Sequence, residues 1–132
     1  MKLNPYLAFN GNCEEAMNFY KDCFNGSMES MSRFGDSPMA NEQNKDKILH
    51  AVLRFDDNVL MGSDSMDGKA IQGGRSVSLA LDVNKEQGET LFNKMAQGGT
   101  VTMPFEKTFW GAMFGMLTDK FGIHWMLNCD EK

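Results

Sequence analysis

The sequence predicts an α+β fold in which two βαβββ modules follow one another along the chain. Residues 7–31 match residues 79–103 without a gap at a constant offset of 72. Residues 55–63 match residues 120–128 at an offset of 65. In both halves an alternating, β-prone stretch precedes a segment with helical apolar periodicity. The chain is therefore predicted to be one unit repeated, with module one at about 1–64, a linker at about 65–75 and module two at about 76–132.

The first module is predicted to begin with a strand at 2–9, where apolar and polar residues alternate. A helix follows, and Asn12 with Glu15 has the spacing of a capping box. Asn25 is expected to end this helix, because it tolerates a left-handed backbone. Its predicted apolar stripe consists of Ala16, Phe19, Tyr20 and Cys23.

Three further strands are predicted in this module, at 27–34, 48–55 and 58–63. The last two are separated by Asp56 and Asp57, as in a β-hairpin. The polar segment 35–47 is expected to be an exposed loop, either a simple connection or a mobile flap.

The second module is predicted to repeat this plan, with Asn84 as the helix cap. The matching apolar stripe consists of Gly88, Leu91, Phe92 and Met95. The strands are expected at 76–82, 100–104, 110–118 and 123–128. With each helix on one face of its sheet, the two opposite faces are predicted to close around a shared cavity.

Composition narrows the classes of function. A net charge of -5 and no basic run argue against nucleic acid as a partner. No apolar run approaches the roughly 20 residues that span a bilayer, and the N-terminal residues lack a signal-peptide core, so a cytoplasmic protein without membrane contact is expected. The 3 cysteines form no CxxC pair and are expected to be reduced and buried. The 12 methionines suit a core or pocket that adapts its shape.

Four stretches carry a resemblance to a known family, at residues 5–20, 60–64, 91–104 and 108–128. They include PYLAFNGNCEEAMNFY, LMGSD and TFWGAMFGMLTDKFGIHWMLN. The sequence resembles the vicinal oxygen chelate superfamily of glyoxalase I, bleomycin-resistance proteins and extradiol dioxygenases, and within it the PhnB-like group. The resemblance implies a single domain with a glyoxalase/bleomycin-resistance-like fold and a paired-sheet cavity, and it favours a homodimer.

Metal-dependent members of the superfamily place His or Glu ligands on the first and last strands of each module. The resemblance transfers these positions to Pro5, Met61, Met126 and one of Ser76, Val77 or Leu79. Proline and methionine do not hold a hard divalent ion. No metal and no cofactor are therefore expected, and the cavity is expected to be apolar and lined by methionine.

The two histidines are the first candidates to replace the missing ligands. His50 and His124 are expected to face the cavity, either as polar contacts, as an acid-base group, or as a metal site completed by Asp64 or Glu106. The full set of candidate cavity residues is His50, Met61, Ser63, Ser76, Trp110, Phe114, His124 and Met126. No catalytic residue is assigned.

The leading hypothesis is a protein that binds a small apolar or aromatic molecule without metal. The alternatives are an enzyme that acts on a small metabolite through a relocated His-based or metal site, and a structural or regulatory dimer with a filled cavity. Relatives of this group are often labelled demethylubiquinone methyltransferases. Methyl transfer is disfavoured here, because the sequence has no glycine-rich strand-to-helix turn and no parallel β-α alternation to hold S-adenosylmethionine.

Overall fold

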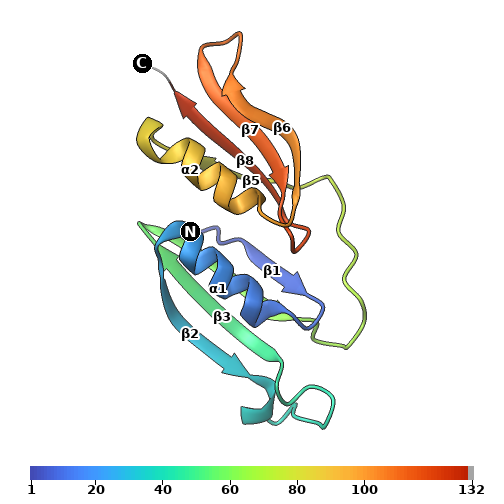
Figure 1. The fold of residues 1–132 in the computed structure, drawn as a ribbon. Helices are drawn as coiled ribbons and strands as arrows, with labels where there is room; N and C mark the ends of the chain where they lie inside the picture. The colour runs from blue at the N-terminus through green and yellow to red at the C-terminus, as the bar shows by residue number, and fades with distance from the viewer. Residues whose placement is uncertain (131–132) are drawn as a thin grey trace. The chain divides into compact units, whose positions relative to one another are not determined.

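The computed structural model describes residues 1–130 and divides into two compact units, Met1–Gln72 and Gly73–Lys132. Each unit contains one helix and a mixed sheet of four strands (Figure 1). The α+β class and the tandem βαβββ arrangement are therefore confirmed. The boundary between the units falls inside the segment 65–75 that was expected to be a linker.

The first unit has the strand order β1-β4-β3-β2, with β1 parallel to β4 and the other pairs antiparallel. Its helix lies on one face of this sheet (Figure 1). Its elements are β1 (Tyr6–Phe9), α1 (Cys13–Phe24), β2 (Ser27–Arg33), the short 3-10 helix η1 (Phe34–Asp36), β3 (Ile48–Phe55) and β4 (Asn58–Asp64).

The second unit repeats the topology with the order β5-β8-β7-β6. Its elements are β5 (Leu79–Asp82), α2 (Lys85–Ala96), β6 (Thr100–Lys107), β7 (Ala112–Thr118) and β8 (His124–Asp130). The two helices start and end 72 residues apart, which is the offset of the sequence repeat. Among the described residues, neither helix is long and apolar enough to cross a membrane.

Several strand bounds differ from the prediction. β1 begins at Tyr6 rather than at residue 2, and β5 begins at Leu79 rather than at residue 76. β6 continues to Lys107 rather than ending at 104. β7 begins at Ala112 because residues 108–111 form a turn, in which the Gly111 N–H donates to the Thr108 carbonyl at 3.2 Å. Gly111 has a φ of 89°, so it belongs to that turn and not to the strand.

Each sheet buries one face against its helix. In α1 the buried residues are Cys13, Ala16, Met17 and Tyr20, so the apolar stripe begins one turn earlier than predicted, while Phe19 and Cys23 are half-buried. In α2, Gly88, Phe92 and Met95 are buried as predicted, and Leu91 is half-buried. Trp125 and Leu127 of β8 are also buried, with exposed fractions of 2% and 0%.

The two helices are capped in different ways. In α2 the Asn84 side chain accepts a hydrogen bond from the Gln87 N–H at 2.8 Å, which confirms the predicted cap. In α1 the Asn12 side chain makes no capping bond, so the predicted capping box is wrong. The backbone of Asn12 has φ -115° and ψ 24°, which is outside the extended region that capping residues usually adopt.

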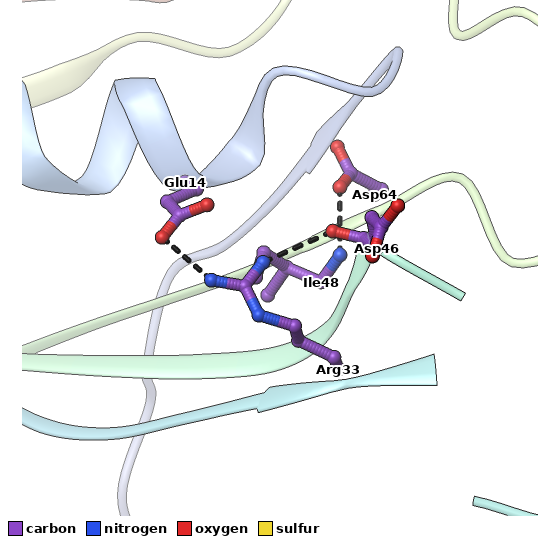
Figure 2. A network of polar contacts seen from close by, with 5 residues as sticks. All are labelled: Glu14, Arg33, Asp46, Ile48 and Asp64. Atoms are coloured by element: carbon purple, nitrogen blue, oxygen red, sulfur yellow. Dashed lines mark hydrogen bonds and ion pairs between the residues drawn. The ribbon is translucent and has the colours of Figure 1, made fainter. Parts of the chain in front are cut away.

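The acceptor for α1 comes instead from the end of β4. The Asp64 carboxylate is 3% exposed, and its Oδ1 accepts from the N–H groups of Gly11 and Cys13, both at 2.9 Å. Its Oδ2 accepts from the Ile48 N–H at 2.8 Å (Figure 2). One side chain therefore joins the start of α1, the start of β3 and the end of β4.

A second polar link lies beside it. The Arg33 guanidinium donates to the Glu14 carboxylate at 2.7 Å and to the Asp46 carbonyl at 3.0 Å (Figure 2). The bond from Arg33 holds the pKa of Glu14 below its usual value. Because both side chains are largely exposed, this pair contributes little stability.

We predict that Asp64→Asn destabilises the first unit by about 2 kcal/mol or more. The asparagine NH₂ group replaces one carboxylate oxygen and cannot accept a hydrogen bond. At least one backbone N–H that Asp64 now binds would therefore be left without an acceptor in the interior. The measurement is urea unfolding, with hydrogen exchange at the Ile48, Gly11 and Cys13 amides. The control is Asp57→Asn, at an exposed hairpin position, which should change stability by less than about 0.5 kcal/mol. Equal stability of the two variants would show that the three hydrogen bonds to the Asp64 carboxylate are not needed.

Candidate functional site

The face of each sheet that its own helix does not cover is called here the helix-free face. On the helix-free face of the first sheet, the strand register places Tyr6, Met61, Val52 and Ser30 side by side in one row. Side chains on neighbouring strands in such a row are in reach of one another. This row contains Met61, one of the positions at which related metal enzymes carry a ligand.

His50 belongs to the same face. The Tyr6 hydroxyl lies 3.2 Å from His50 Nδ1, and the two rings stack with centroids 5.7 Å apart. Since β4 separates the strands that carry them, the two side chains meet across β4, on the side to which Met61 and Ser63 also belong by alternation. Tyr6 is 50% exposed, whereas Ser63 is only 3% exposed.

A hollow of about 460 Å³ opens on this face. Val52, Val59 and Met61 supply its apolar part. Its polar rim includes the ion pair between Arg54 and Glu29. The hollow thus combines three apolar side chains with polar and charged ones.

The helix-free face of the second sheet is richer in sulfur. Its register places Ala80, Met126, Met116 and Met103 in one row, so three methionines lie on three adjacent strands. Phe114 lies on the same face, opposite Glu106 on one side and Asn128 on the other. The second unit therefore presents a flexible, polarisable surface next to an aromatic ring.

The structure brings only some of the remaining predicted residues together. Trp110 lies in the β6–β7 turn with an exposed fraction of 55%, and its ring is 5.8 Å from that of Phe114. His124 Nδ1 is 2.8 Å from the Thr118 hydroxyl, across the β7–β8 pair. Ser76 is exposed and precedes β5.

His50 and His124 belong to different units, and each has a hydrogen-bond partner from its own unit. The sequence did not indicate Tyr6 as the partner of His50. That contact spans three strands and depends on the sheet order.

The strand registers settle which residue matches Pro5 in the second unit. Tyr6 pairs with Met61, and the Met61 N–H donates to the Pro5 carbonyl at 3.0 Å. Ala80 pairs with Met126 in the same parallel manner. The residue before Ala80, Leu79, therefore occupies the position that Pro5 occupies in the first unit.

The four positions that match the metal ligands are thus Pro5, Met61, Leu79 and Met126. None of these side chains has an oxygen or nitrogen donor, so this set does not fit a divalent ion that prefers His and carboxylate ligands. Within residues 1–130 there is no group of three or more His, Cys, Asp or Glu side chains placed to hold a metal ion.

Neither carboxylate proposed to join a histidine completes such a site. Both oxygens of Asp64 accept from buried backbone N–H groups. Glu106 lies opposite Phe114, which is four residues along β7 from Thr118, the partner of His124. His50 belongs to the first unit.

The cysteines are not organised as a reactive site. Cys13 and Cys129 are buried, as expected, whereas Cys23 is half-buried, and none of the three forms a disulfide. Burial, together with the neighbouring Asp64 carboxylate, raises the pKa of Cys13 to about 12. Its thiolate, the nucleophilic form, is therefore scarce near neutral pH.

Gly115 of β7 lies where two neighbouring elements pack closely. A Cβ at this position would lie 2.8 Å from Cα of Phe105 and from a ring carbon of Phe92. The glycine thus allows the bulged β6 and the ring of α2 to pack closely against β7. The space serves packing inside the second unit.

These two βαβββ units define a protein with the glyoxalase-like fold of the vicinal oxygen chelate superfamily. The model of the family described as 3-demethylubiquinone-9 3-methyltransferase matches residues 1–128, and the chain belongs to this PhnB-like family.

Relatives support this assignment over the whole chain. Protein YjdN of Escherichia coli is 34% identical and is covered over 95% of its length, with 97% of this chain aligned. The crystal structure of protein PA1353 from Pseudomonas aeruginosa is 45% identical, with a TM-score of 0.91 and coverage of 100% of this chain and 99% of that one. The PhnB protein from Bacillus cereus is 30% identical, with a TM-score of 0.84 and coverage of 98% and 99%.

More distant structures share the fold alone. They include a glyoxalase-related enzyme from Fulvimarina pelagi, with 19% identity and a TM-score of 0.66. Another is the fosfomycin resistance protein FosX from Listeria monocytogenes, with 10% identity and a TM-score of 0.68.

We predict that iodoacetamide modifies Cys23 before Cys13 or Cys129 in the folded protein at about pH 8. Cys23 is more exposed than the other two thiols, and the raised pKa of the buried Cys13 makes its thiolate scarce. Peptide mass mapping over time measures the order of labelling. Cys23→Ser should remove the early label, and Cys13 labelled as fast as Cys23 would contradict the assignment.

Proposed function

We propose that this protein binds a small apolar or aromatic molecule on the helix-free faces of its sheets, without a metal at the positions used by metal-dependent relatives. The observation that carries the proposal is the row formed by Met103, Met116 and Met126 on three adjacent strands. Methionine side chains are flexible and polarisable, so such a row can adapt to an apolar ligand.

The neighbouring groups support the same class of ligand. Phe114 supplies an aromatic ring beside this row, and Trp110 contacts that ring. In the first unit, Val52 and Met61 are among the residues that line the hollow of about 460 Å³. The methionine row and the aromatic rings beside it favour ligands that bind by burying their own apolar area.

Binding without metal is supported by the side chains at the four ligand-equivalent positions, Pro5, Met61, Leu79 and Met126. Replacing hard donors by apolar groups removes the means of polarising a substrate oxygen there. Catalysis of the metal-assisted kind used by the superfamily is therefore not proposed for this chain.

An alternative is an enzyme that acts on a small metabolite through a relocated site. The contact between the Tyr6 hydroxyl and His50 Nδ1 favours this alternative, because a paired phenol and imidazole can exchange a proton with a ligand. Methyl transfer, which the family description names, is not part of the proposal. No described strand-to-helix turn is glycine-rich in the way that S-adenosylmethionine sites require.

We further propose that the protein acts as a cytoplasmic homodimer, with a small molecule and not nucleic acid or membrane as its partner. A two-fold dimer is the commonest closed assembly of a soluble chain. The net charge of -5 disfavours contact with phosphate backbones and anionic lipid surfaces.

The binding proposal is tested with N-phenyl-1-naphthylamine, a neutral aromatic probe whose fluorescence rises in apolar surroundings. We expect saturable binding that Met126→Lys weakens by about tenfold or more, since the charge must be desolvated beside the probe. The matched control is Met39→Lys, in the exposed loop before β3, which should leave affinity unchanged. Thermal unfolding of each variant checks that it is folded. No saturable binding by the wild type, or equal affinities of the two folded variants, would overturn the proposal.

Native mass spectrometry after dialysis against Mn²⁺, Zn²⁺ and Ni²⁺ tests the metal and the assembly together. We expect a species of twice the chain mass with no stoichiometric ion, because the ligand-equivalent side chains are apolar. An ion retained by the wild type and lost in His50→Ala or His124→Ala would favour the relocated-site enzyme instead. A monomer at micromolar concentration would contradict the dimer.

A further inference from the structure

A second hollow, of about 540 Å³, lies in the first unit and does not include the residues of the proposed apolar site. It is walled by three pieces of chain, which are the turn between β1 and α1, the loop that precedes β3, and the segment that follows β4. Apart from two glycines, Met66 and Ala70 are the only apolar residues among the described residues that line it. Its chemistry is therefore polar.

The walls are held by side-chain hydrogen bonds to the backbone. The Asn10 amide pairs with both backbone groups of Ile71, at 3.1 Å and 2.6 Å, and fixes the segment after β4 to the β1–α1 turn. Asn41 Oδ1 accepts from the N–H groups of Gln43 and Asn44 at 2.9 Å and 2.8 Å, which folds the loop. The same loop is tied to η1, because the Gly35 N–H donates to the Lys45 carbonyl at 3.0 Å.

Lys47 is placed at this hollow by close packing on a glycine. Its Nζ lies 3.4 Å from the Gly11 carbonyl, and a Cβ built on Gly11 would be only 2.8 Å from that nitrogen. Gly11 also has a φ of 98°, which disfavours other residues. The glycine thus leaves the space in which the Lys47 ammonium sits.

Two ammonium groups, of Lys47 and Lys69, and two carboxylates, of Asp64 and Asp67, line the hollow. Lys47 and Lys69 form no ion pair with any side chain in the described part of the chain. Asp64 lines the hollow as well, but its two oxygens already accept three backbone N–H groups. Asp67 uses Oδ1 to accept from the Ser65 hydroxyl and the Lys69 N–H, at 3.1 Å and 3.0 Å.

We infer that this hollow is a binding site for a small hydroxylated anion, a carboxylate or phosphate ester, whose charge is paired by Lys47 and Lys69. The side-chain amide of Gln43 and the polar groups of the neighbouring walls provide hydrogen bonds for its hydroxyl groups. Ammonium groups attract oxyanions of either type as point charges. The inference does not depend on the proposed apolar site, because the two hollows share no residue.

The test uses the full chain and three probes, glycerol phosphate, gluconate and uncharged glycerol, measured by calorimetry at low salt. We expect saturable binding of at least one of the two anions and none of glycerol. Lys47→Gln and Lys69→Gln should each weaken anion affinity by about fivefold or more, because each removes a charge-assisted contact. The matched control is Lys45→Gln, in the same loop, whose ammonium pairs with Glu42 and does not line the hollow.

Amide chemical shifts locate the site. Titration with the bound anion should move the Gly11, Gln43 and Lys69 resonances, and should leave the affinity for N-phenyl-1-naphthylamine unchanged. Each variant is checked by thermal unfolding. The inference would be overturned if neither anion binds or if glycerol binds equally well. It would also be overturned if both lysine variants are folded and keep the affinity of the wild type. Displacement of the naphthylamine probe by the anion would show that the anion binds at the apolar site, and would overturn it as well.

Discussion

The first unit depends on a single buried carboxylate. Asp64 accepts hydrogen bonds from the starts of α1 and β3, while its own backbone pairs with Phe9 at the end of β1. Four elements therefore meet at one residue, three of them through its side chain. A buried charge is tolerable only when its hydrogen bonds are complete, and here the donors are N–H groups that would otherwise lack partners at the helix start. The carboxylate and the helix end thus satisfy each other.

The second unit reaches the same fold without that interaction. At the sequence offset of 65, the position of Asp64 is taken by Cys129, which is buried. The helix start is capped locally by Asn84, the counterpart of Asn12 at the offset of 72. Its buried carboxylate lies elsewhere, at Asp119, where Oδ2 accepts from the Trp125 indole at 2.8 Å and Oδ1 closes the β7–β8 turn. The repeated topology therefore requires satisfied helix ends, and either a distant or a local side chain can satisfy them.

This difference explains which features the sequence could predict. Local signals gave both helices and most strand bounds, and Asn84 capped its helix as expected because its acceptor is three residues from the donor. The same reasoning from nearby residues failed at Asn12. There the acceptor is Asp64, which is 51 residues from the donor Cys13 in the chain. The match to Pro5 stayed open among Ser76, Val77 and Leu79 until the pairing of β5 with β8 fixed the register. The hollow beside Lys47 also had no local signal, since three separate segments build it.

The positions that carry metal ligands in related enzymes take part in this fold through their backbone. The Pro5 carbonyl accepts from the Met61 N–H, a bond that any residue at either position except proline at Met61 could form. Met61 and Met126 lie on the helix-free faces, whereas Leu79 pairs with the buried Trp125 and therefore belongs to the helix side of β5 and β8. Because the Met61 and Met126 side chains point away from the helices, the residue type at these two positions is not fixed by the helix-side cores or by the sheet ladders. Fold and chemistry are therefore separable in this family, and neither metal-assisted catalysis nor methyl transfer follows from membership in it.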